Sequence, residues 1–271
     1  MAATSSKNDH DDKVTHPYHL VDPSPWPFLT SMAAFVSAIG GVLMMNEYSP
    51  VTLIIGLAFL IFCFVGWTRD VAKEGDEQKH HNSVVQNGLR FGFALFVISE
   101  LMLFVSLFWA FFNASIAPTD AIQNMWPPKN IETMDPFSLP YFNTLLLLLS
   151  GTTLTWSHHA LLEGRQKEMV QGLGLTVLIG VVFLGVQMAE YAHAPFAFTD
   201  GIYPSTFYMA TGFHGAHVLI GTIFLLVCYF RGKAGLFTPD HHVSFEAAAW
   251  YWHFVDVVWI FLFVSIYWWG S

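Results

Sequence analysis

The sequence predicts an all-α polytopic membrane protein with seven transmembrane helices. Of its 271 residues, 54% are hydrophobic and 11% are charged, whereas soluble domains carry about 25% charged residues. A helix that crosses the hydrocarbon core of a bilayer needs about 20 mostly apolar residues. Seven stretches of the chain meet this requirement, at residues 28–46, 50–68, 88–112, 140–160, 170–193, 205–230 and 244–269.

The connections between these stretches divide the chain into two helical parts. A tight turn at residues 46–50 joins the first two stretches, and a charged segment at 70–82 separates them from the other five. The longest connection, 114–139, contains Trp126-Pro127-Pro128, which predicts an ordered, turn-rich loop. We therefore expect an N-terminal segment (1–27), a two-helix part (28–69), an inner loop (70–87) and a five-helix part (88–271).

The basic residues predict the orientation, because Lys and Arg concentrate on the inner side of a membrane. All Lys and Arg residues except Lys129 lie in segments that the helix order places on one side. The N-terminus is therefore expected on the cytoplasmic or matrix side and Ser271 on the periplasmic or intermembrane side. The first 25 residues are polar and contain no apolar core of a secretory signal.

Composition also excludes several other classes of protein. The net charge is −9 and no large cluster of Lys and Arg is present, which argues against a nucleic-acid partner. The two cysteines, Cys63 and Cys228, lie inside predicted helices, where we expect them to behave as small apolar side chains. No Ser or Cys stands beside a recognisable base, so the sequence predicts no catalytic residue.

Ionisable residues inside the predicted helices are the candidate functional residues, because a charge near the bilayer centre costs about 2.5–3.5 kcal/mol. Glu100 lies in the third stretch, and the sixth carries His214 and His217. The seventh carries Glu246, His253 and Asp256. At about 1.5 Å per residue from the inner boundary, these groups reach similar depths. A buried polar network that links the three stretches is therefore possible. In such a network His253 could pair with Glu100, because the two lie at a similar depth. We expect Glu100 to be a structural hydrogen-bonding group, with proton relay as the alternative.

The spacing of some acidic and histidine residues within the predicted helices also suits metal or haem ligands. Glu190-xx-His193 resembles half of a carboxylate di-iron site, but a second such motif is missing. His214 and His217 are spaced to hold a metal or a haem, but the adjacent Gly212 and Gly215 favour close helix packing. We therefore expect this chain to bind no metal and no haem.

Several motifs resemble subunit III of aa3-type cytochrome c oxidases, in the haem–copper oxidase superfamily. They include ATGFHGAH at 210–217, TWSHH at 155–159 and the run 245–271. Further matches are HLVDPSPWP at 19–27, ISE at 98–100 and WPP at 126–128. The resemblance extends over about 16–271, and two helices ahead of a five-helix body match the cytochrome c oxidase form rather than the quinol oxidase form.

This resemblance implies a non-redox core subunit of a proton-pumping oxidase in aerobic respiration. It implies a V-shaped bundle whose cleft holds structural phospholipids, direct packing on subunit I, and association with subunit II. Haem and copper belong to those partners. The subunit would stabilise subunit I and support proton uptake. Family lipid contacts match Arg69, Lys73, Glu74, His81 and Arg231. Thr68 departs from the family pattern, which has a second Trp after Trp67, so one aromatic lipid contact is lost.

Two alternatives remain at this stage. The buried acids and histidines also suit an independent membrane proton or solute carrier, and His214, His217 and His253 suit a haem protein in its own right. The membrane is expected to be a bacterial plasma membrane or a mitochondrial inner membrane.

Groups expected to collect protons on the inner side are His10, His16, His19, Asp76, Glu77, His80, His81, Asp240, His241 and His242.

Overall fold

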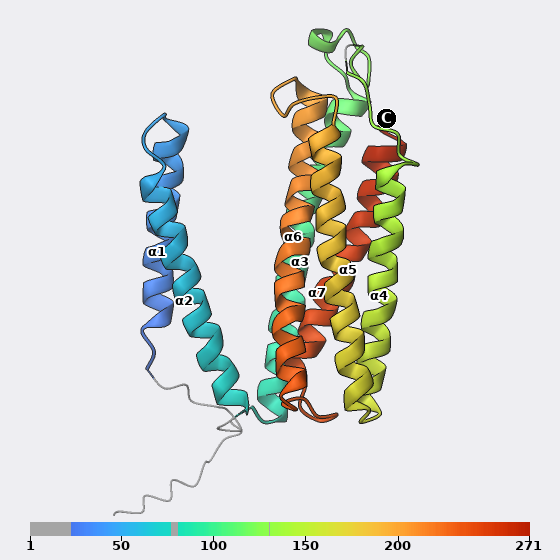
Figure 1. The fold of residues 1–271 in the computed structure, drawn as a ribbon. Helices are drawn as coiled ribbons and strands as arrows, with labels where there is room; N and C mark the ends of the chain where they lie inside the picture. Colours follow the sequence, from blue (N-terminus) through green and yellow to red (C-terminus); the bar gives the residue numbers. More distant parts are fainter. Residues whose placement is uncertain (1–22, 77–80, 130) are drawn as a thin grey trace, which may run out of the picture. The chain divides into compact units, whose positions relative to one another are not determined.

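The computed structural model describes residues 23–76, 81–129 and 131–271, and within them the chain forms seven α-helices (Figure 1). The predicted all-α fold is therefore confirmed. The predictions for His10, His16, His19, Glu77 and His80 lie outside the described residues. The helices are α1 (Trp26–Met45), α2 (Val51–Asp76), α3 (Ser83–Ile116), α4 (Leu139–Leu162), α5 (Gln166–His193), α6 (Ile202–Lys233) and α7 (Val243–Leu262). A 3₁₀ turn, η1 (Asp120–Ile122), precedes α4, and a π-helical turn, η2 (Phe263–Trp268), follows α7.

Six of these helices are long and apolar enough to cross a membrane, among the residues that the structure describes. The exception among the seven predicted spans is α4. Its 24 residues extend over about 36 Å, and it runs beside α5 (Figure 1). Small polar side chains lower its hydropathy, and they include the buried Asn143, Ser150 and Ser157. These groups bond inside the bundle, so a low hydropathy is compatible with a place among membrane helices.

The helices around the first inner connection extend further than the apolar pattern indicates. The second helix continues to Asp76, and α3 begins at Ser83 instead of at residue 88. The start of α3 is capped, because the backbone N–H of Val85 donates to Asn82 Oδ1 at 3.0 Å. Hydropathy detects where a helix leaves the hydrocarbon, whereas backbone hydrogen bonding continues the helix through the polar interface.

The described chain separates into two compact units, Met1–Gly88 and Leu89–Ser271. In the first unit, α1 and α2 pack as a helical hairpin. A Cβ added to Gly56 would lie 2.7 Å from Ser37 N, so the two backbones approach closely at this glycine. The indole Nε1 of Trp26 donates to Asp70 Oδ2 at 2.5 Å, which links the two helices near their inner ends. Cys63 is fully buried within this unit.

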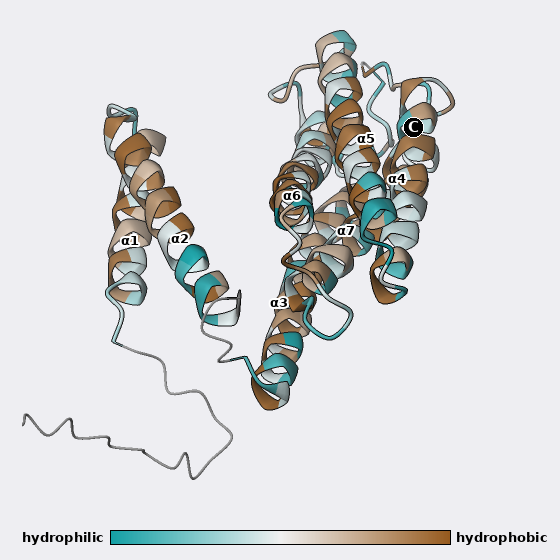
Figure 2. Ribbon diagram, turned by 60° about the horizontal axis from the view of Figure 1, so that its bottom comes forward, coloured by the Kyte–Doolittle hydropathy of each residue, from teal (hydrophilic) through white to brown (hydrophobic). Residues whose placement is uncertain are grey.

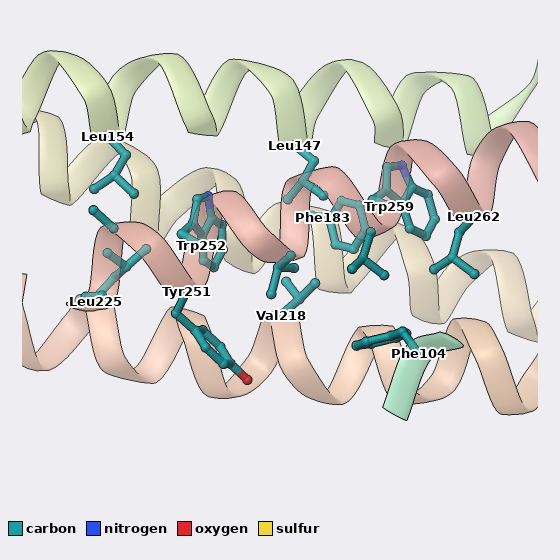
Figure 3. Close-up of a cluster of buried hydrophobic side chains, with 14 of the residues drawn as sticks. Phe104, Leu147, Leu154, Phe183, Val218, Leu225, Tyr251, Trp252, Trp259 and Leu262 are labelled. Atoms are coloured by element: carbon teal, nitrogen blue, oxygen red, sulfur yellow. The ribbon is translucent and has the colours of Figure 1, made fainter. Parts of the chain in front are cut away.

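The second unit is built around α7, whose large aromatic side chains form the core (Figure 3). Trp252 and Trp259 are both fully buried. In Figure 3 their rings lie among side chains of neighbouring helices, including Leu147 of α4 and Phe183 of α5. Phe183 meets Trp259 edge to face, with ring centroids 4.9 Å apart. This helix therefore occupies the interior of the five-helix unit.

The close approach at Gly56 yields a stability prediction. Gly56→Leu should destabilise the first unit by about 1–3 kcal/mol, because the new side chain meets the α1 backbone. Gly41→Leu is the matched control, since nothing lies within 4 Å of a Cβ at Gly41. The measurement is thermal labelling of Cys63 by a thiol-reactive fluorophore in detergent, with Cys228 replaced by Ala. Equal midpoints for the two variants would contradict the proposed packing.

Candidate functional site

The first polar contact inside the bundle joins α3 to α6. Nε2 of His217 lies 2.9 Å from Glu100 Oε2, and its Nδ1 lies 2.7 Å from the backbone oxygen of Phe213. A carbonyl oxygen only accepts, so Nδ1 carries a hydrogen and donates it. The Nε2–Oε2 bond then holds one proton, on either atom, and the pair is neutral overall. The suggested pairing of Glu100 with His253 is wrong, because the structure places His217 there.

The second contact joins α6 to α7. His214, one turn before His217, has its Nε2 3.1 Å from the backbone oxygen of Val255, to which it donates. Its ring is fully buried and lies against the rings of Phe183 and Trp259, at centroid distances of 5.9 and 4.9 Å. Because His214 and His217 bond to different helices, they do not converge on one metal or haem position.

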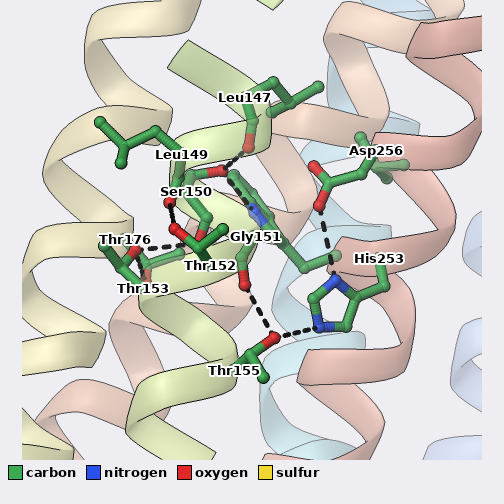
Figure 4. Close-up of polar contacts among 12 residues, drawn as sticks. Leu147, Leu149, Ser150, Gly151, Thr152, Thr153, Thr155, Thr176, His253 and Asp256 are labelled. Atoms are coloured by element: carbon green, nitrogen blue, oxygen red, sulfur yellow. Dashed lines mark hydrogen bonds and ion pairs between the residues drawn. The ribbon is translucent and has the colours of Figure 1, made fainter. Parts of the chain in front are cut away.

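The third contact joins α7 to α4 (Figure 4). Nδ1 of His253 lies 3.5 Å from Asp256 Oδ2, and its Nε2 lies 3.4 Å from Thr155 Oγ1. Asp256 is buried, whereas the His253 side chain is 44% exposed. A Cβ on Gly151 would lie 2.5 Å from Asp256 Oδ2, so only a glycine at position 151 of α4 leaves room for this carboxylate. The four candidate residues of α6 and α7 thus take part in three separate contacts rather than one network.

Sequence reasoning missed the pairing of Glu190 with Tyr267. The Tyr267 hydroxyl donates to Glu190 Oε1 at 2.6 Å, and both residues are buried. His193, by contrast, turns its Nδ1 to the backbone oxygen of Ala189 at 2.7 Å. Glu190-xx-His193 is therefore not a ligand pair. A buried acid near the end of one helix and a tyrosine near the C-terminus gave no sequence signal, because their contact depends on how α5 and the segment formed by α7 and η2 are rotated about their axes.

A row of hydroxyl groups on α4 also went unrecognised. The indole N–H of Trp252 donates to Ser150 Oγ, and that of Trp259 donates to Thr144 Oγ1, both at 2.9 Å. Ser157 continues this row and bonds to a backbone oxygen of α5. Asn143, Ser150 and Ser157 recur every seven residues and so share one face of α4, whereas Thr144 lies about 100° further around the helix. That periodicity of small polar residues was the available signal.

An ion pair lies at the end of the unit where α7 begins. Arg90 Nε on α3 donates to Glu246 Oε2 in the first turn of α7 at 2.7 Å. The other carboxylate oxygen, Oε1, lies 3.5 Å from His242 Nε2. Both side chains of the ion pair are partly buried, so the charges have lost part of their hydration and hold α7 to α3.

The residues expected to contact lipid fall on both units. Arg69 and Lys73 are exposed and lie one turn apart near the end of α2, where Figure 2 shows hydrophilic residues. Glu74 follows on the same turn, and His81 lies close by, because a Cβ on the adjacent Gly75 would lie 2.6 Å from its Nδ1. These four residues therefore gather at one helix end.

Arg231, the fifth expected lipid contact, belongs to the second unit. It lies in the last turn of α6, and its guanidinium carbon is 5.3 Å from the ring centroid of Phe237. A cation over an aromatic face is attracted by the ring. The position suits an anionic group at the membrane interface.

Long apolar helices and ionisable groups tied to neighbouring helices define an integral membrane protein. Residues 16–271 match the family model described as "Cytochrome c oxidase subunit III". Proteins named cytochrome c oxidase subunit 3 from Prototheca wickerhamii and Arabidopsis thaliana are 55% and 54% identical over 258 residues. The zebrafish (Danio rerio) protein of that name is 51% identical over 256 residues. These alignments cover 94% of this chain and 97–98% of the relatives. The chain belongs to the cytochrome c oxidase subunit III family.

The geometry around Glu100 predicts unequal effects of two substitutions. Glu100→Gln should leave stability nearly unchanged, because the amide N–H can donate to His217 Nε2. Glu100→Ala leaves that nitrogen without its partner and should cost about 1 kcal/mol. Thermal labelling of the buried Cys228, with Cys63 replaced by Ala, measures both. A Gln variant that assembles normally but loses proton pumping would overturn the structural interpretation of this carboxyl group.

Proposed function

We propose that this chain is the non-redox core subunit of a proton-pumping cytochrome c oxidase. Its role there is to stabilise the haem- and copper-bearing subunit I, bind structural phospholipids and support proton uptake. The observation that carries the proposal is the family match over residues 16–271, together with relatives that are more than half identical over nearly their whole length. In this assignment the oxidation of cytochrome c takes place in the partner subunits.

The exposed surface of the helices supports a place inside a larger membrane assembly. On α3, Phe91, Leu95 and Trp109 are 75%, 67% and 71% exposed. Within a bilayer such side chains are covered by lipid tails or by an apolar helix of a partner. The basic inner ends of α2 and α6 support an orientation with the N-terminus on the cytoplasmic or matrix side. Both a bacterial plasma membrane and a mitochondrial inner membrane fit.

The independent carrier is the weaker alternative. A carrier needs polar groups that exchange partners as the substrate passes. Here Glu100, Glu190 and His214 each have a fixed partner on a neighbouring helical element. Such contacts are typical of structural links between helices. Proton or solute transport by the isolated chain in liposomes would favour the carrier, whereas co-purification with a haem–copper subunit supports the oxidase subunit.

Lipid binding at the two basic helix ends gives a direct test. Phosphate groups accept charge-assisted hydrogen bonds from arginine, so Arg69→Ala combined with Arg231→Ala should lower the phospholipid retained by the purified oxidase. The double variant should also inactivate faster during turnover while its initial rate stays close to that of the parent. Lipid phosphorus per complex and the progress curve of oxygen uptake measure the two effects.

Arg165→Ala is the matched control for this experiment. Arg165 is exposed at the start of α5 and already engaged by Glu168 and Glu163, whose hydrogen bonds raise the pKa of its guanidinium above the usual value. Its loss should leave lipid content unchanged. Unaltered lipid content and lifetime in the Arg69/Arg231 double variant would refute the assignment of these residues.

The inner connection between α6 and α7 supports a second part of the proposal, the uptake of protons. Asp240 and His241 are exposed there, and histidine is the residue type that exchanges protons near neutral pH. Replacing them by Asn and Gln should slow oxidase turnover mainly above about pH 8, where free protons are scarce and collecting groups matter most. A pH profile of turnover identical to that of the parent would remove this part of the proposal.

A further inference from the structure

Three side chains with metal-binding chemistry converge at the inner end of the second unit. They are His158 near the end of α4, His242 directly before α7, and Glu246 in the first turn of α7. One nitrogen or oxygen atom from each lies within 4.8 Å of the other two. The end of α4 and the start of α7 lie at the same end of the unit (Figure 1). In the oxidase function proposed above, His158 and Glu246 have no role, and His242 is expected only among the proton-collecting groups.

The hydrogen bonds around His242 leave its Nε2 available as a ligand. Nδ1 lies 3.0 Å from the backbone oxygen of Thr238, and because that oxygen only accepts, Nδ1 carries the hydrogen. A neutral imidazole then has a lone pair on Nε2, which lies 3.5 Å from Glu246 Oε1. Two acceptors face each other there. A histidine that donates its other N–H to a backbone carbonyl is the usual arrangement around a bound metal.

His158 adds a second nitrogen atom that lacks a partner. Its Nε2 is buried and has no hydrogen-bond partner among the described residues. The ring lies beside that of His242, with centroids 5.7 Å apart, and against Phe245 at 5.3 Å. A buried polar nitrogen without a partner is costly, and a cation bound between the two rings would satisfy it.

Glu246 is already oriented by a neighbour. Its Oε2 accepts from Arg90 Nε at 2.7 Å, which leaves Oε1 facing His242. Ligating carboxylates are commonly fixed by such an outer hydrogen bond. The carboxylate also supplies the negative charge that two neutral imidazoles lack.

We propose that His158, His242 and Glu246 form a binding site for a divalent transition metal ion, with Zn²⁺ as the best-fitting ion. Two imidazoles and one carboxylate are a recurrent zinc ligand set with an open fourth position. At Zn–ligand distances of about 2.0–2.1 Å, tetrahedral ligand atoms lie about 3.3 Å apart. The 3.5 Å between His242 Nε2 and Glu246 Oε1 is close to that value. Ca²⁺ and Mg²⁺ prefer sets of oxygen ligands and do not suit this site. Metal binding would fasten the end of α4 to the start of α7.

The test compares zinc bound by the intact oxidase complex and by its variants. After treatment with a chelator, each complex is equilibrated with micromolar Zn²⁺, desalted and analysed for zinc per complex. The parent and His159→Gln should retain one more zinc ion than His158→Gln or His242→Gln. His159 is the matched control, because it is the adjacent histidine and is exposed outside the cluster. Partner subunits contribute equally to all samples, so the difference isolates this site.

A second measurement does not depend on zinc counting. Cys228 is fully buried, and its Sγ lies 3.8 Å from the backbone oxygen of Ser244 in the first turn of α7. Its labelling midpoint during heating should rise by roughly 5–10 °C when Zn²⁺ is present at 100 times its Kd. The midpoint should not rise with Mg²⁺, nor with Zn²⁺ in His158→Gln.

Two results would overturn the proposal. One is equal zinc content in the parent, His158→Gln and His242→Gln, and the other is a parent midpoint that Zn²⁺ leaves unchanged. The alternative, a proton on His242 that bridges to Glu246 without any metal, predicts both of these results. If a histidine variant fails to assemble, Glu246→Asp is tested instead. This substitution keeps the negative charge but shortens the side chain, so it should lower zinc occupancy. Full zinc occupancy in Glu246→Asp would also contradict the proposed site. None of these measurements requires turnover, so their outcome is separate from that of the oxidase assignment.

Discussion

The absence of water from the hydrocarbon core is the constraint on which this structure depends. Each polar group placed there must find a partner within the protein, because an unsatisfied one costs several kcal/mol. Helices satisfy the backbone, and the side chains follow the same rule. Ser37, Thr68 and Thr222, for example, return their hydroxyl groups to carbonyl oxygens of their own helices. Polar side chains that reach another helix then act as specific links between elements.

These links are concentrated on α7 and explain its place in the core. Two buried indoles combine a large apolar surface with an N–H that must be satisfied, and both donate to hydroxyl groups of α4. Shape alone would leave the rotation of α7 loosely determined, since many apolar side chains pack acceptably. The indole bonds fix that rotation, and the backbone bond from His214 to Val255 fixes its position along α6. The polar atoms therefore contribute specificity to a fold that dispersion forces hold together.

Buried polar groups serve two different ends in this molecule. Glu100 with His217 and Glu190 with Tyr267 are pairs in which one donor meets one acceptor. The cluster of His158, His242 and Glu246 differs, because an acceptor nitrogen of His242 faces an acceptor oxygen of Glu246 and Nε2 of His158 has no partner among the described residues. An arrangement of acceptors is stable only if a cation, whether a proton or a metal ion, lies among them. This difference in donor count separates a structural link from a binding site.

The sequence by itself determined the class of fold, the order of the helices and the family. Apolar runs of about 20 residues can only be membrane helices, and long motifs such as that at residues 210–217 are specific enough to identify a family. Depth along a helix could also be counted, and of the links that this count made possible the structure shows one, from Glu100 to His217 of the sixth stretch. The tertiary structure alone decided the partners. Rotation and tilt of the helices placed His217 rather than His253 beside Glu100 and placed Tyr267 beside Glu190. They also brought His158 at the end of α4 close to His242 and Glu246 at the start of α7. A linear sequence reports position along a helix axis, but a contact between side chains depends on the angle around that axis, which only packing against the other helices sets.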